Sequence, residues 1–184
     1  MHRLREQFLL HRIRVRHDTQ AYAEIYEQYA ERITRFIRLK VASMEDAEEL
    51  QSEVFEQAWE SLCKTRVINL SAYLYTIARR VVADHYRKNE RRVKETSLAE
   101  GSEIADSIDL QSAVTQSSDL ATVEKALYNI FEEYRELIVM RFMDEMSITE
   151  IARALQKTPN NVRVSIHRAL GALKRAIEEL SHHT

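Results

Sequence analysis

The sequence predicts an all-α protein in which two small helical domains are joined by a flexible acidic linker. Its 184 residues include only two Gly and one Pro, too few for the turns of a β architecture. Apolar residues recur at helical spacing along most of the chain. Residues 93–120 differ from both neighbours, because they hold one basic and six acidic side chains. The expected domains are residues 1–92 and 120–184, with the linker at 93–119.

Composition limits the classes of function. The chain is 45% hydrophobic and 30% charged, as in an ordinary soluble protein. Its single cysteine, Cys63, excludes a disulfide framework and a cysteine zinc cluster, and it fits a cytoplasmic location. No apolar run approaches a membrane span, and the N-terminus lacks a signal-peptide core, so no membrane insertion is expected. We find no phosphate loop, catalytic constellation or metal cluster in the sequence, which predicts a protein without enzymatic activity, cofactor or metal.

The first two predicted segments lie before residue 42. Residues 1–16 are basic and loosely periodic, which allows either a frayed extension or a short first helix. Residues 19–41 predict a long amphipathic helix. Its apolar and aromatic positions keep helical spacing and are expected in the core: Tyr22, Ile25, Tyr29, Ile33, Phe36 and Ile37.

The next predicted helix, residues 43–62, begins at Ser43 with Asp46 as its start signal. Its buried stripe is predicted to be Ala47, Leu50, Val54, Ala58 and Leu62. The segment has no Lys or Arg, and much of its remaining surface is acidic, at Glu48, Glu49, Glu53, Glu56 and Glu60. Such a surface is typical of a solvated helix, and it also fits a basic partner.

After a connecting loop at 63–70, Ser71 is expected to open a helix that runs to Lys88. One face is apolar, with His85 at its edge as a packing residue. Between Arg79 and Arg92 there are six Lys or Arg against two acidic residues, and tyrosines are interleaved with them. Cations that follow a backbone, together with rings that stack on exposed bases, favour single-stranded nucleic acid.

The linker, residues 93–119, is rich in Ser, Asp and Glu and has no aromatic residue, which is typical of a mobile tether. The following segment, up to Met143, is expected to build a second core. Its predicted members are Val123, Ala126, Leu127, Ile130, Phe131, Leu137, Ile138, Met140 and Phe142.

The stretch from Ser147 to Ile177 predicts a helix-turn-helix. Ser147 and Glu150 have the spacing of a capping box, ahead of the apolar series Ile148, Ile151, Ala152 and Leu155. Thr158 can cap a second helix that begins at Pro159. A turn of three or four residues between two helices is the spacing of this motif.

The second helix of this motif has two unlike faces. Its apolar side is predicted to hold Val162, Ile166, Ala169, Leu170, Leu173, Ala176 and Ile177. From Thr158 to Arg175 there are four Lys or Arg and no acidic residue. An acid-free face with Asn and Arg fits phosphates and base edges, although an ordinary amphipathic C-terminal helix is the alternative.

Three motifs together resemble one family. The residues of the helix-turn-helix resemble the promoter-reading C-terminal domain of bacterial RNA polymerase sigma factors of the extracytoplasmic-function (ECF) type. The 43–62 segment resembles the family signature DAEDLxQEVFxxAW, with Glu49 and Ser52 in place of the usual Asp and Gln. The 71–88 segment resembles WLYxIARNxxxDxxR, with Tyr73 for Trp and Arg80 for Asn. Gln156 stands where Gly is usual. The resemblance covers residues 19–88 and 120–177 in the family's order.

The resemblance implies a sigma factor that binds the largest subunits of core RNA polymerase and directs it to promoter DNA. It places the polymerase contact at Asp46, Glu49, Leu50, Glu53, Val54, Glu56, Gln57 and Trp59. It places reading and melting of the start-proximal (minus-10) element at Asn69, Ser71, Tyr73, Thr76, Arg79, Arg80, Tyr86, Arg87 and Lys88. It places reading of the upstream (minus-35) element at Thr158, Pro159, Asn160, Asn161, Arg163, Val164, His167, Arg168 and Arg175.

The resemblance further implies a monomer when free and an anti-sigma factor as a partner usual for the family. Two other classes of function remain open. A helix-turn-helix regulator that works without polymerase would explain the C-terminal motif, but not the acidic helix or the basic tyrosine-bearing helix. A metal-dependent nuclease would need Glu49, Glu53 and Glu56 to converge on a metal ion.

Overall fold

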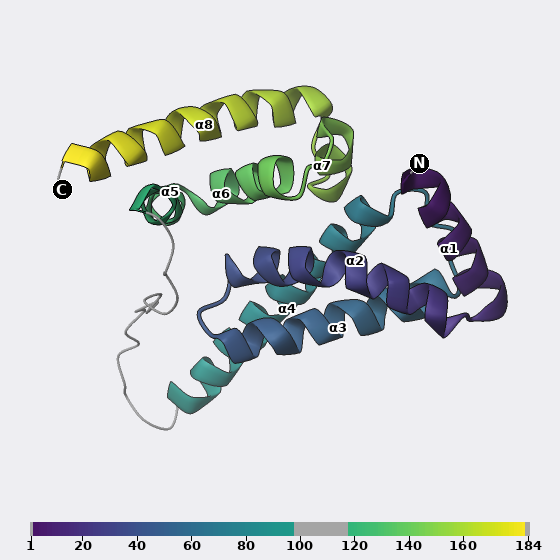
Figure 1. Cartoon of the computed structure of the whole chain (residues 1–184). Coiled ribbons are helices and arrows are strands. Elements are labelled where there is room, and N and C mark those ends of the chain that lie inside the picture. Colours follow the sequence, from purple (N-terminus) through teal and green to yellow (C-terminus); the bar gives the residue numbers. More distant parts are fainter. Residues whose placement is uncertain (1, 98–117, 183–184) are drawn as a thin grey trace. The chain divides into compact units, whose positions relative to one another are not determined.

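The computed structural model describes residues 2–97 and 118–182, and these residues form helices and connecting turns without a strand (Figure 1). The prediction of an all-α fold is therefore confirmed. The chain divides into two compact units, Met1–Leu110 and Gln111–Thr184. Most of the predicted linker 93–119 lies outside the described residues. The helices on either side reach into its predicted range, to Ser97 and from Ser118.

The first unit consists of four helices, α1 His2–Arg16, α2 Thr19–Arg38, α3 Met44–Leu62 and α4 Leu70–Ser97. α2 packs against the other three, and α3 packs against α1 and α4. Every residue predicted for the α3 stripe is buried, and so are the predicted core residues of α2 except the half-buried Tyr22. The basic N-terminal segment is a helix, because Leu9, Leu10 and Ile13 give it a buried face.

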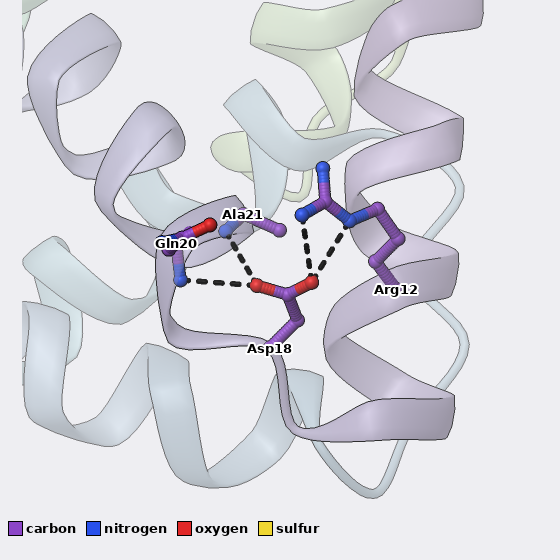
Figure 2. A network of polar contacts seen from close by, with 4 residues as sticks. All are labelled: Arg12, Asp18, Gln20 and Ala21. Carbon is purple, nitrogen blue, oxygen red and sulfur yellow. Dashed lines mark hydrogen bonds and ion pairs between the residues drawn. The ribbon is translucent and has the colours of Figure 1, made fainter.

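Asp18 stabilises the connection between α1 and α2 (Figure 2). Its Oδ1 accepts the backbone N–H groups of Gln20 and Ala21, each at 3.0 Å, and so caps α2. Its Oδ2 accepts the guanidinium of Arg12 from α1, at 2.7 Å from Nη2 and 2.9 Å from Nε. His17, between the two helices, has a left-handed φ of 51°. One carboxylate therefore starts one helix and ties it to the preceding one.

The second unit contains α5 Ser118–Tyr128, α6 Glu132–Ile138, the π-helix η1 Val139–Met143, α7 Ile148–Ala154 and α8 Pro159–His182. α8 packs against α5, α6 and α7. Buried residues of α5, α6 and α8 and of the turn between α5 and α6 meet in one core, and partly buried side chains of the same three helices complete it. The buried members are Ala126, Ile130, Ile138, Ala169 and Ala176.

Three predictions for the core of the second unit are wrong. Val123, Phe131 and Phe142 are 37%, 79% and 52% exposed. Phe131 has an extended backbone just before α6, so the helical phase assumed across residues 129–131 is broken there. Phe142 lies in η1, where the π-helical winding shifts each side chain relative to an α-helix.

Arg135 holds the break between α5 and α6. Its Nε donates to the carbonyl of Leu127 at 2.8 Å, and its Nη2 donates to the carbonyls of Tyr128 and Ile130 at 2.8 and 3.3 Å. The guanidinium carbon lies 4.9 Å from the ring centroid of Tyr128. Burial is the main cause that lowers the pKa of Arg135 from its ordinary value. The side chain thus supplies donors to carbonyls at the end of α5.

Candidate nucleic-acid and partner surfaces

The turn between α7 and α8 has the predicted capping at both sides. Ser147 Oγ accepts the backbone N–H of Glu150, whose carboxylate accepts the backbone N–H of Ser147 in return. Gln156 has a left-handed φ of 53°. Around it, Lys157 N donates to Ala152 O at 2.9 Å and Gln156 N donates to Arg153 O at 3.3 Å, the two bonds of a Schellman motif.

α8 begins directly after this turn. The backbone N–H of Asn161 donates to Thr158 Oγ1 at 3.2 Å, so Thr158 caps the helix as expected. On its inner side, Val162, Ile166 and Ala169 are buried. Leu170 was predicted on this side but is 43% exposed. It directly follows the fully buried Ala169, and at about 100° per residue it is rotated away from the core contact.

All nine side chains predicted to read duplex DNA are exposed, from Thr158 to Arg175. The surface includes two amides, an imidazole and three arginines within about four turns of one helix. No ion pair joins Arg163, Arg168 or Arg175 to a carboxylate in the part of the chain that the structure describes. These cations are therefore available to an anionic ligand.

α3 supplies the acidic surface of the first unit. Glu49 and Glu56 are exposed, and Asp46, Glu53, Gln57 and Trp59 are half-buried. Leu50 and Val54, which were predicted to contact a partner, are 3% and 0% exposed. Because the hydrophobic effect places them in the core between the helices, their side chains are not available for a partner.

Aromatic packing on one side of α3 was not predicted. The ring of Trp59 lies edge-to-face with Tyr22, at 5.0 Å between centroids, and Phe55 packs in the same way against Tyr22 and Tyr26. The hydroxyl of Tyr22 donates to the carbonyl of Phe55, and burial raises the pKa of Tyr22 well above its ordinary value. The signal in the sequence for this aromatic packing was Phe55, an aromatic residue next to the predicted buried stripe of α3.

The start of α4 differs from the prediction. The helix begins at Leu70, and Asn69 Oδ1 caps it by accepting the backbone N–H of Ala72 at 2.8 Å. Ser71, predicted both to open the helix and to contact DNA, is buried in the first turn. Asn69 is the better cap because its side chain lies just before the helical residues and reaches the free N–H groups.

The basic residues of α4 lie along a partly exposed surface. Arg80, Tyr86, Arg87 and Lys88 are exposed, whereas Tyr73, Thr76 and Arg79 are half-buried. Some of them have internal partners. Thr76 donates to the carbonyl of Ala72 in its own helix, Tyr86 donates to the carbonyl of Lys40, and Arg87 pairs with Asp84 at 2.7 Å.

A groove separates α3 from the basic face of α4. Its walls carry an aromatic ring, hydroxyls, an amide and charges of both signs. The lining residues are Gln57, Glu60, Ser61, Lys64, Thr65, Tyr73, Arg80 and Asp84. The hydroxyl of Tyr73 donates to Ser61 Oγ at 2.7 Å, and Arg80 Nη2 donates to Gln57 Oε1 at 2.5 Å. The groove therefore lies between the surface of α3 that was predicted to bind a protein and the surface of α4 that was predicted to bind nucleic acid.

Two kinds of site do not occur in the described ranges, 2–97 and 118–182. No group of three His, Cys, Asp or Glu residues is placed there to hold a metal ion. Within the same ranges, none of the helices has the length and apolar character needed to cross a membrane.

Comparison with known families matches both units. Residues 25–92 match the family model described as Sigma-70 region 2, and residues 123–173 match the one described as Sigma-70, region 4. The first match includes the acidic face of α3 and the basic face of α4. The second includes α7, the turn and most of α8. α1 lies outside both matches.

Individual relatives are similar along most of the chain. The ECF RNA polymerase sigma factor BldN of Streptomyces coelicolor is 26% identical over 166 residues, which cover 88% of this chain and 62% of that protein. The ECF RNA polymerase sigma factor SigW of Bacillus subtilis is 25% identical over 172 residues, which cover 89% of this chain and 92% of that protein. The chain thus spans about three fifths of BldN and nearly all of SigW.

Solved structures share the fold. CnrH, in complex with the cytosolic domain of CnrY, superposes with a TM-score of 0.66 at 18% identity, covering 95% of this chain and 98% of that chain. The sigma factor RpoE of Bartonella quintana, in complex with the anti-sigma factor NepR, superposes with a TM-score of 0.65 at 22% identity, covering 85% of this chain and 96% of that chain.

Proposed function

The chain belongs to the sigma-70 family as an RNA polymerase sigma factor of the ECF type, and we propose that its two units divide promoter recognition between them. The second unit reads the upstream element and the first binds core polymerase and opens the start-proximal element. The observation that carries this proposal is the presence of both surfaces in one chain, an acid-free exposed face on α8 and an acidic face on α3.

α8 enters the major groove with the face that begins at Thr158. The nine exposed side chains on α8 and its cap would supply both positioning and sequence reading. Arg163 and Arg168 would bind phosphates or guanine edges, and Asn160 and Asn161 have the amide that pairs with adenine. A helix-turn-helix places its second helix in this way, with residues near the helix N-terminus at the base edges.

α3 binds a basic surface of the largest subunits of core polymerase. Glu49 and Glu56 are the exposed carboxylates at its centre, and Asp46, Glu53, Gln57 and Trp59 would take part from half-buried positions. Leu50 and Val54 support this surface from the core. Charge complementarity of this kind speeds association and selects the partner more than it adds raw affinity.

α4 and the groove beside it hold the unpaired strand of the start-proximal element. Exposed Arg87 and Lys88 would follow the phosphates, exposed Arg80 would contact the strand within the groove, and the rings of Tyr73 and Tyr86 would stack on bases. Unpairing the duplex costs a few kcal/mol per base, which stacking and phosphate contacts would offset. The chain itself needs no catalytic residue for this step, because the polymerase forms the phosphodiester bonds.

Run-off transcription tests the proposal directly. Purified core polymerase would be incubated with genomic fragments, including the DNA upstream of this protein's own gene, with and without the chain. Transcripts with defined starts that need the chain are the expected result. No specific transcript and no co-purification with core would overturn the proposal and favour a regulator that works without polymerase. Specific binding to a duplex site without core would point to the same alternative.

An anti-sigma factor is a further expected partner. CnrH and RpoE were solved in complex with CnrY and with the anti-sigma factor NepR, and such a partner would hold the free chain, a cytoplasmic monomer, inactive by covering both units. Affinity purification of the tagged chain from its native host should yield a stoichiometric protein that blocks run-off transcription when it is added back. Recovery of core polymerase alone would count against this partner.

A further inference from the structure

Gln57 connects the acidic face of α3 to the basic face of α4. Its Nε2 donates to Glu53 Oε1 at 2.9 Å, and its Oε1 accepts Nη2 of Arg80 at 2.5 Å. A carboxylate only accepts hydrogen bonds and a guanidinium only donates them. One orientation of the Gln57 amide therefore satisfies both neighbours, and the reverse orientation satisfies neither. The three side chains form a relay with a fixed direction, from Glu53 through Gln57 to Arg80.

The relay holds Arg80 without neutralising it. In the described part of the unit, four other arginines pair with carboxylates, and Arg87 with Asp84 at 2.7 Å and Arg35 with Glu31 at 2.8 Å are two of them. Within the described residues no carboxylate lies at ion-pair distance from Arg80, whose partner is a neutral amide. A side chain that is already held loses less rotamer freedom on binding. Its other N–H donors remain free for a ligand with two adjacent acceptors.

The groove around Arg80 suits a single unpaired nucleotide. The ring of Tyr73 forms part of its wall and is fixed by the hydrogen bond of its hydroxyl to Ser61. Lys64, on the same groove, can approach a phosphate. Of the two carboxylates there, Asp84 is neutralised by Arg87. A stacking surface, a cation for the backbone and a positioned guanidinium are the parts of a base-reading site.

We propose that Gln57 is a positioning residue for Arg80, and that Arg80 held in this way selects guanine among the unpaired bases that enter the groove. Guanine presents O6 and N7 side by side, and arginine binds that pair with two parallel hydrogen bonds. The inference rests on the proposed function, because it concerns the strand that the first unit would hold open. It adds the identity of a base and a residue on α3 that controls it.

Binding of single-stranded DNA to the reconstituted holoenzyme tests the inference. The probes are fluorescent non-template oligonucleotides that span the start-proximal element, with guanine, 7-deazaguanine, adenine or cytosine at each position in turn. At one position the wild-type holoenzyme should prefer guanine over 7-deazaguanine, which lacks N7, by about tenfold. Gln57→Leu should reduce this ratio to near one and change binding of the other probes little. Arg80→Lys should lose the same ratio, and Gln57→Leu should have no further effect in its presence.

Two more variants separate positioning from a general effect on the fold. Gln51→Leu is the matched control, because Gln51 lies on the same helix, is half-buried and donates its amide to the carbonyl of Ala30; it should retain the guanine preference. Gln57→Glu places a carboxylate against Arg80 and should weaken binding of every probe, whatever its sequence. A merely structural role for Gln57 would not give a loss confined to the guanine preference with Leu and a uniform loss of binding with Glu.

The outcomes distinguish the relay from the proposed function. If Gln57→Leu keeps the guanine preference, or if the wild type prefers cytosine or no base at all, the relay is overturned even when run-off transcription succeeds. If the wild-type chain neither binds core polymerase nor yields transcripts, the proposed function is wrong, and the inference about Gln57 and Arg80 is wrong as well. Loss of the preference in Gln57→Leu supports both, when it is measured on holoenzyme assembled at saturating core polymerase, because Gln57 also lies on the proposed polymerase surface.

Discussion

The carboxyl group of Asp18 makes the stability of the first unit depend on pH in the acidic range. The backbone N–H of Ala21, followed by the guanidinium of Arg12, lowers the pKa of this carboxyl below its ordinary value of 3.8. A group with a depressed folded pKa stabilises the fold fully above its unfolded pKa, and that contribution is lost as the pH falls through the lower folded value. Asp18 therefore contributes at neutral pH and ceases to contribute only in strong acid.

We expect Asp18→Asn to lower the melting temperature of the first unit at neutral pH, because Asn can still cap α2 but cannot pair with Arg12. The gap between wild type and variant should shrink as the pH falls below 3.8. Thermal unfolding followed by circular dichroism across this range measures the gap. Glu27→Gln, at an exposed site on α2, is the control. A gap that stays constant with pH would contradict the assigned role of the charge.

The two residues Gln156 and Gly171 suggest a second prediction. Gln156 holds a left-handed φ of 53° without being glycine, and Gly171 lies inside α8, where an added Cβ would meet only Arg175 Nη1, at 3.8 Å. Gly171→Ala should stabilise the second unit by about 0.5–1 kcal/mol, since alanine is the better helix former. Gln156→Gly should stabilise it by up to about 1 kcal/mol. Urea unfolding of each variant measures the change in the free energy of unfolding. If either substitution destabilises the unit, the replaced residue makes a stabilising contact that the structure does not show.

At the level of single residues, the sequence predicted exposure better on α8 than on α3 and α4. The acid-free face of α8 could be read from its periodicity, because polar residues there have no reason to be buried. Leu50, Val54 and Ser71 were assigned to surfaces through the family resemblance and are buried. A family signature does not separate residues that touch a partner from residues that support them. Gln57 was assigned to the polymerase contact. Its hydrogen bond to Arg80 could not be predicted from the sequence, because it depends on how close α3 and α4 lie to each other.

At the level of elements, charge reversal on α3 tests the proposed polymerase surface. Glu56→Lys is a cleaner change than Glu53→Lys, because Glu56 is exposed and Glu53 also anchors Gln57. We expect Glu56→Lys to weaken binding of core polymerase about tenfold, with the melting temperature unchanged, because a like charge would face a basic partner. Titration of labelled chain with core measures the affinity. Glu27→Lys on α2 makes the same change of charge elsewhere, and an equal loss there would mean that only net charge matters.

Alanine substitutions on α8 test the upstream reading. Arg168→Ala and Asn161→Ala should each lower transcription from a matched promoter by about five- to a hundredfold, the effect of losing one good contact to a base. Lys174→Ala removes a positive charge from the same helix, at a residue whose partner is Glu178, and should have a small effect. If Arg168→Ala transcribes as well as the wild type from promoters that carry each of the four bases at the contact position, the assignment of Arg168 is wrong.

Element boundaries show where sequence patterns carry too little information. The interruption between α5 and α6 contains neither glycine nor proline, and the structure satisfies its carbonyls through Arg135, a residue that follows the interruption. The π-helical turn at Val139–Met143 likewise has no local signal. By contrast, the capping box at Ser147 and the cap at Thr158 were predicted, because each depends on neighbours within a few residues.

For the molecule as a whole, the two units have separate cores and should respond separately to damage. Arg135→Met removes the donors to three carbonyls of the second unit and should cost it about 2 kcal/mol or more. Hydrogen exchange should accelerate in α5 to α8 and stay unchanged in α1 to α4. Arg153→Met, at an exposed position on α7, is the control. Equal acceleration in both units would show that they unfold as one.

The position of Trp59 makes the chain its own optical probe. It is the single tryptophan of the sequence, half-buried on α3 beside the exposed carboxylates, with its indole 5.0 Å from the ring of Tyr22. A protein that docks on this face would remove water from the indole and shift its emission to shorter wavelength. A ligand that occupies only α8 would leave the spectrum unchanged. Partners of the two units can therefore be told apart in solution without attaching a dye.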